Sequence, residues 1–150
     1  MVKEMKSGAS QRTLKGEPFS VRFTRSTDRM VEEEARRTRR SKSAIVESLT
    51  DEAIRMRRFA GIGFRGEDAA RRPWVIGSGL DVWEIIQMLD DLGSVELLAD
   101  ETQLTERQVR LAIAYRDNYR EEIAEAIAQN RRTVAAWHEL YPFVEISPTA

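Results

Sequence analysis

The chain of 150 residues contains no cysteine, and His138 is its only histidine. The lack of cysteine excludes disulfides and thiolate metal sites and is typical of a reducing compartment. No apolar run approaches the roughly 18 residues that a membrane-spanning helix needs. Residues 1–16 also lack the apolar region of a secretory signal. We therefore expect a cytoplasmic protein that binds no metal or other cofactor.

Groups that could carry out catalysis are also scarce. The single histidine lies in an aromatic segment, where a surface or packing role is the simpler interpretation. The acidic pairs Asp90–Asp91 and Glu121–Glu122 are adjacent in sequence. Adjacent residues do not face each other on a helix, so these pairs do not predict a two-carboxylate active site. We expect no enzymatic activity, although a carboxylate–metal site in a nucleic-acid-processing enzyme remains a formal alternative.

The chain has almost no net charge, but its charges are separated along the sequence. Residues 1–65 contain 16 Lys/Arg and 9 Asp/Glu, whereas residues 66–150 contain 8 Lys/Arg and 16 Asp/Glu. The first 16 residues are polar and basic, which predicts a flexible arm. A basic part joined to an acidic part suggests a polyanion as one partner and a different molecule as the other. Chance clustering of solvated charges is the alternative.

The stretch FSVRFT at residues 19–24 alternates apolar and polar side chains like a β-strand. A lone strand cannot satisfy its own backbone hydrogen bonds. Two copies paired antiparallel across a two-fold axis would satisfy each other. Phe19, Val21 and Phe23 would then face the helices of both chains, and the other three side chains would face outward.

Two helices are expected after this strand. Ser26 or Thr27 can cap the first, and Ser41 can cap the second. The apolar residues of the second helix recur at helical spacing as Ala44, Ile45, Leu49, Ala53 and Ile54. Residues 17–59 therefore predict a strand–helix–turn–helix unit.

A paired ribbon of this kind fits the major groove of DNA. The outward residues Ser20, Arg22 and Thr24 offer groups that hydrogen-bond to base edges. The free N–H groups after Ser41 form an anion site, and charge is added by Arg39, Arg40 and Lys42. An ordinary charged helix surface is the alternative for the arginines at 36, 37, 39 and 40.

The strand FSVRFT, the two-helix spacing and the segment TRRSKSAIVESL resemble the ribbon-helix-helix repressors over about residues 17–58. Arg39 stands where these families usually have glycine. The resemblance implies a homodimer, formed through residues 19–24 and both N-terminal helices, that binds operator DNA. It implies base contacts by Ser20, Arg22 and Thr24, and phosphate contacts by Ser41 and Lys42.

The stretch from Gly61 to Pro73 has three glycines, which predicts a linker at residues 60–73. Residues 74–150 then predict a small helical domain. Its first helix has one apolar face and ends at Gly93, Ser94 caps a short helix, and Thr105 with Gln108 forms a capping box. A long helix is expected from Glu106 to about His138.

This domain resembles a small helix-turn-helix-like domain of bacterial antitoxins over about residues 73–125. The resemblance rests on the opening GSGLDV at residues 77–82 and on the segment AIAY at residues 112–115. It implies a toxin partner, plausibly a PIN-like ribonuclease.

The aromatic tail supplies the expected toxin contacts, Trp137, Leu140, Tyr141 and Phe143. Packing of the tail onto its own domain or onto the dimer mate is the alternative. The expected fold is mainly α, with a ribbon-helix-helix DNA-binding domain followed by a small all-helical domain. The expected function is that of an antitoxin-type transcriptional regulator. The second hypothesis is a stand-alone repressor whose acidic domain serves only dimerisation.

Overall fold

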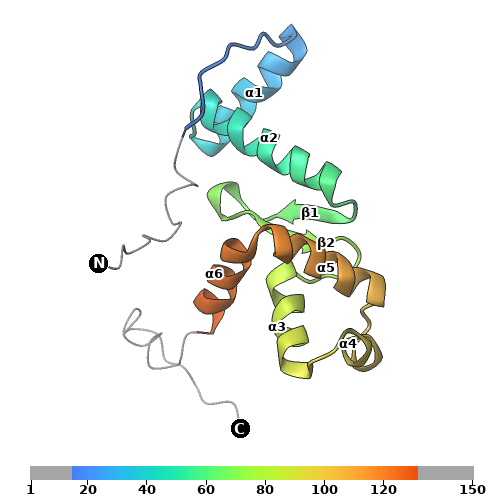
Figure 1. The fold of residues 1–150 in the computed structure, drawn as a ribbon. Coiled ribbons are helices and arrows are strands. Elements are labelled where there is room, and N and C mark those ends of the chain that lie inside the picture. The colour runs from blue at the N-terminus through green and yellow to red at the C-terminus, as the bar shows by residue number, and fades with distance from the viewer. Residues whose placement is uncertain (1–14, 132–150) are drawn as a thin grey trace, which may run out of the picture. The chain divides into compact units, whose positions relative to one another are not determined.

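The computed structural model describes residues 15–131, with the side chain of residue 69 excepted. These residues are mainly helical and include one small antiparallel sheet (Figure 1). The elements are α1 (Arg25–Thr38), α2 (Lys42–Arg58), β1 (Ile62–Arg65), the 3-10 helix η1 (Asp68–Ala70), β2 (Arg72–Val75), α3 (Val82–Leu92), α4 (Val95–Glu101), α5 (Glu106–Asn118) and α6 (Arg120–Asn130). The prediction of a mainly α protein is confirmed for this part of the chain.

The chain divides into two compact units, Met1–Lys42 and Ser43–Ala150. The described part of the first unit is the segment of residues 15–24, helix α1 and the turn that follows it. Nearly all of α2 lies in the second unit. The sequence analysis predicts instead that both helices belong to one domain of residues 17–59. The second half of α2 makes side-chain contacts within the second unit, because Arg55 hydrogen-bonds to Tyr115 and Glu122.

The predicted linker at residues 60–73 contains most of a β-hairpin. β1 pairs with β2 antiparallel, with Ile62 opposite Val75 and Gly63 opposite Trp74. Gly63 is buried, and a Cβ atom at this position would lie 2.9 Å from Nε1 of Trp74. Glycine is therefore required here by the close approach of an indole ring, whereas the sequence suggested a flexible connection.

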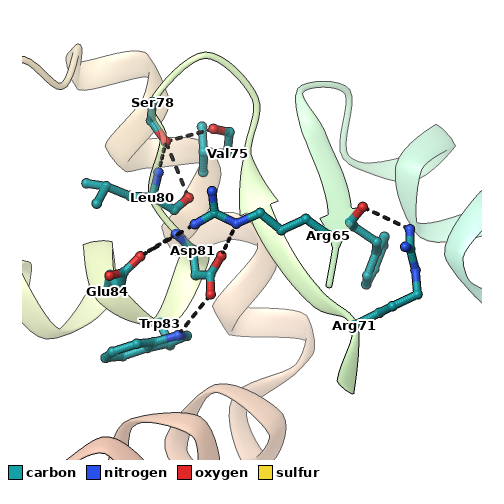
Figure 2. A network of polar contacts seen from close by, with 9 residues as sticks. Arg65, Arg71, Val75, Ser78, Leu80, Asp81, Trp83 and Glu84 are labelled. Carbon is teal, nitrogen blue, oxygen red and sulfur yellow. Dashed lines mark hydrogen bonds and ion pairs between the residues drawn. The ribbon is translucent and has the colours of Figure 1, made fainter. Parts of the chain in front are cut away.

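A network of hydrogen bonds and ion pairs joins this hairpin to the start of α3 (Figure 2). Nε of Arg65 on β1 donates to Oδ1 of Asp81 at 2.7 Å, and Nε1 of Trp83 donates to Oδ2 of the same carboxylate at 3.3 Å. The backbone N–H of Asp81 donates to Oε2 of Glu84 at 2.7 Å, which satisfies a free donor at the helix start. The guanidinium of Arg65 also lies over the ring of Trp74, 5.1 Å from its centroid. Asp81, which is only 8% exposed, is thus a buried charge with its partners in place.

The hydrophobic core of the second unit lies between the hairpin and helices α3, α4, α5 and α6. The predicted apolar face of α3 is confirmed, since Val82, Ile85 and Ile86 are buried. Gly93 ends α3 in a left-handed conformation, and Ser94 caps α4, both as expected. The capping box at the start of α5 is likewise present.

The expectation of one unbroken helix from Glu106 is wrong. The helix ends at Asn118, and Tyr119, with φ −133° and ψ 47°, separates α5 from α6. The change of direction allows α6 to pack against α3 and bury Ile123. Neither glycine nor proline occurs at the break, so the sequence carries no local signal for it.

Candidate nucleic-acid interface

Residues 15–24 precede α1 and form neither helix nor strand within the single chain. Phe19 is 88% exposed, Val21 58% and Phe23 37%. Three consecutive odd-numbered positions therefore present large apolar side chains to solvent. This pattern is the one expected of a strand whose mate lies in a second chain, and that pairing stays a prediction.

The alternating polar positions differ in their surroundings. Ser20 and Arg22 are exposed. Thr24, by contrast, is the N-cap of α1, where its Oγ1 accepts a hydrogen bond from the backbone N–H of Thr27 at 3.3 Å. The prediction that Ser26 or Thr27 caps this helix is wrong, because the helix begins at Arg25. The capping hydroxyl remains exposed. The base contact of Thr24 stays a prediction.

The turn between α1 and α2 is built around a left-handed residue. Arg39 has φ 54° and ψ 36°. The backbone N–H of Arg40 donates to the carbonyl of Ala35 at 3.1 Å, and that of Arg39 donates to the carbonyl of Arg36. These two bonds close the end of the helix in the manner of a Schellman motif, which normally has glycine at the left-handed position.

Replacing Arg39 by glycine is expected to raise the free energy of unfolding by about 0.5–1 kcal/mol. The left-handed conformation costs a residue with a side chain about 1 kcal/mol, and the greater freedom of glycine in the unfolded chain offsets part of the gain. Thermal or urea denaturation measures the change. The matched control is Arg37→Gly inside α1, which should lower stability by about 1 kcal/mol. Equal losses in the two variants would show that the turn is not left-handed in solution.

Lys42, a predicted phosphate contact, makes ion pairs within its own unit. Its Nζ lies 2.6 Å from Oδ1 of Asp28 and 3.5 Å from Oε1 of Glu32. The hydrogen bond that Lys42 donates to the carboxylate of Asp28 raises the pKa of Lys42. The ammonium is about half exposed, so a phosphate could approach it, but the two carboxylates of α1 already hold it beside the turn. Asp28 and Glu32 lie one helical turn apart on α1, so both carboxylates can reach the same ammonium group.

The remaining predicted phosphate contacts lie close together in sequence at this turn. Arg39 and Ser41 are exposed, and Arg40 is partly buried. α2 begins at Lys42, directly after Ser41. The structure thus brings Arg39, Arg40, Ser41 and Lys42 together at the turn and the beginning of one helix, where backbone N–H groups attract anions.

The second unit holds a partly buried ionic cluster that sequence reasoning missed. Nη1 of Arg55 on α2 donates to Oη of Tyr115 at 2.8 Å and to Oε2 of Glu122 at 2.7 Å. The hydroxyl of Tyr115 lies 3.2 Å from Oε1 of Glu122, and the guanidinium of Arg55 lies 4.0 Å from the ring centroid of Tyr119. These contacts join the second half of α2 to α5 and α6.

The charge states in this cluster follow from burial and pairing. Burial opposes the charge of Arg55, but its hydrogen bonds with Glu122 and Tyr115 outweigh burial and raise its pKa. Burial and the nearby carboxylate of Glu122 raise the pKa of Tyr115. Arg55 therefore stays cationic and Tyr115 stays neutral throughout the ordinary pH range. Such a cluster holds α2, α5 and α6 together.

The predicted toxin contacts Trp137, Leu140, Tyr141 and Phe143, and also His138, lie outside the described residues. Within residues 15–131, no group of three or more His, Asp or Glu side chains is placed to hold a metal ion. No helix in the same part of the chain is long and apolar enough to cross a membrane.

Comparison of the chain with protein-family models, with curated proteins and with solved structures found no match. The ribbon-helix-helix and antitoxin resemblances therefore rest on the sequence motifs alone.

Proposed function

We propose that this protein is an antitoxin-type transcriptional regulator. Two copies pair through residues 19–24 to form a β-ribbon that binds operator DNA. The acidic C-terminal helical domain of residues 74–150, which we call the acidic unit, binds and neutralises a toxin such as a PIN-like ribonuclease. The observation that carries the proposal is the exposed apolar row of Phe19, Val21 and Phe23, which directly precedes a helix, a left-handed turn and a second helix.

The apolar row supports dimerisation on energetic grounds. Burial of a large apolar side chain contributes roughly 1.5–3 kcal/mol, and six such side chains would meet in a symmetric pair. α2 adds further apolar surface, since Leu49 is 49% exposed, Ile54 45% and Met56 43%. Pairing of two copies would remove such surfaces from water and supply the missing hydrogen-bond partners of the strand.

The distribution of charge supports two different partners. The basic residues cluster in residues 1–65, where the exposed Arg22 and the turn at Arg39–Lys42 lie. The acidic excess lies in residues 66–150. An acidic surface is complementary to the basic cleft of a ribonuclease and would compete there with RNA.

Replacing Arg22 by alanine is expected to weaken binding to the DNA immediately upstream of the protein's own coding sequence by about 30-fold or more. Each lost base contact costs about 1–3 kcal/mol, and a symmetric dimer loses two. Fluorescence anisotropy with that duplex and with a scrambled duplex measures affinity and specificity. Arg107→Ala, an exposed arginine of the acidic unit, is the matched control and should bind like the parent. An unchanged footprint for Arg22→Ala would exclude base reading by this residue.

A salt titration and a co-expression experiment complete the test. The logarithm of DNA affinity should fall with the logarithm of salt concentration by about 0.9 per phosphate neutralised. Co-expression with the product of an adjacent gene should give a stable complex and remove that product's toxicity. A DNA-binding dimer without such a partner would instead identify the stand-alone repressor.

A further inference from the structure

The second unit carries an open groove on the face formed by α3, α5 and α6. Its volume is about 370 Å³. The apolar lining comes from Ile86, Ile123, Ala124 and Ile127, and charged residues are Asp90, Arg116 and Arg120. Ile86 and Ile123 form a buried floor, whereas Ala124 on α6 is exposed. An apolar floor with a charged edge is suited to a short amphipathic segment.

Two arginines at the edge of the groove, Arg116 and Arg120, pair with the same aspartate. Nε of Arg116 lies 2.9 Å from Oδ1 of Asp117, and Nη2 of Arg120 lies 3.6 Å from the same oxygen. Two guanidinium groups therefore share one carboxylate. The side chain of Arg120 is 75% exposed, so its guanidinium can donate hydrogen bonds to a further carboxylate from an incoming segment.

The described chain ends beside this groove. α6 ends at Asn130, one turn after the groove residue Ile127, and Nη2 of Arg131 lies 3.3 Å from Oδ1 of Asp91 on α3. Nineteen further residues follow in the sequence. Nine of them, extended, reach up to about 30 Å, whereas the 11 residues of α6 are about 16 Å long. The following segment is thus long enough to return along the whole groove.

The chemistry of that following segment matches the groove. Residues 133–150 contain Trp137, Leu140, Tyr141 and Phe143, and their only Asp, Glu, Lys or Arg residues are Glu139 and Glu145. The segment therefore offers apolar side chains for the floor and carboxylates for the two arginines. We propose that residues 137–143 of the free protein dock into the α3–α5–α6 groove of their own chain. This docking is independent of whether a toxin exists, and a toxin that uses the same aromatic residues would have to displace them.

The lack of native cysteine permits a direct test by crosslinking. In the full-length protein, Ala124→Cys combined with Leu140→Cys should form an intramolecular disulfide under mild oxidation, because the two positions would be neighbours. The matched control combines Leu140→Cys with Ala114→Cys, an exposed alanine of α5 outside the groove lining, and should crosslink at least tenfold more slowly. Non-reducing electrophoresis and peptide mapping identify the product.

Each other outcome contradicts the proposal. A disulfide between two chains would assign the groove to the tail of a second copy. Equal crosslinking rates for the two pairs, or none for either, would show that the tail does not occupy the groove. A second measurement avoids cysteine: Arg120→Glu should accelerate proteolytic removal of the tail severalfold, whereas Arg110→Glu, on the exposed side of α5, should leave the rate unchanged.

Discussion

Replacing Arg55 by methionine is expected to lower the free energy of unfolding by about 3 kcal/mol or more. The Arg55 side chain is only 13% exposed, and its guanidinium is the common partner of Glu122, Asp51 and the hydroxyl of Tyr115. Its loss removes the guanidinium partner of the partly buried carboxylate of Glu122, which is 23% exposed. Breaking a buried ion pair from one side typically costs about 3–5 kcal/mol for this reason. Urea denaturation monitored by circular dichroism measures the change.

A matched control and a double variant separate pairing from packing. Arg57→Met lies on the same helix at an exposed position and should change stability by no more than about 0.5 kcal/mol. The double variant Arg55→Met/Glu122→Met removes both charges and should recover much of the loss, because apolar pairs often replace buried ion pairs without penalty. A loss below about 1 kcal/mol for Arg55→Met alone would show that the cluster contributes little to the second unit.

The second large effect concerns the proposed dimer. Val21→Asp is expected to weaken self-association by about 100-fold or more, since a symmetric pair would bury two ionised carboxylates in an apolar interface, at a cost of roughly 3 kcal/mol or more. Sedimentation equilibrium across a dilution series measures the dissociation constant. DNA binding should be lost together with the dimer, because the ribbon needs both strands.

The neighbouring position provides the control. Ser20→Asp introduces the same charge one residue earlier, on the opposite face of an extended strand. This variant should remain dimeric but bind DNA poorly, because its carboxylate would face the phosphates and bases. Equal effects of the two substitutions on self-association would contradict an alternating ribbon. A parent protein that sediments as a monomer at micromolar concentration would contradict the dimer itself.

Local chemistry made much of the second unit predictable. The caps at Ser94 and Thr105 and the left-handed Gly93 act over one turn of helix, so the sequence around each residue was enough to place the ends of α3, α4 and α5. The apolar face of α3 followed from its spacing in the same way. At the candidate interface, the departure of Arg39 from glycine marked the position that the structure shows to be left-handed.

Contacts between residues far apart in sequence decided the rest. The guanidinium of Arg55 meets Glu122 across 67 positions, and Arg65 meets Asp81 across 16. Three glycines at residues 61–66 suggested a linker, whereas the reason for Gly63 is its contact with the indole of Trp74 on the neighbouring strand. The break at Tyr119 likewise follows from the burial of Ile123 against α3.

The helical character, the caps and the separation of basic from acidic charge could be predicted, because all three depend on composition or on neighbours within one helical turn. Contacts in the folded chain were needed to show that α2 is joined to α5 and α6, that residues 62–75 form a hairpin and that α5 and α6 are separate helices. These features depend on ion pairs and packing contacts between side chains that are far apart in sequence. The periodicity of a single segment does not indicate which distant residues it will contact.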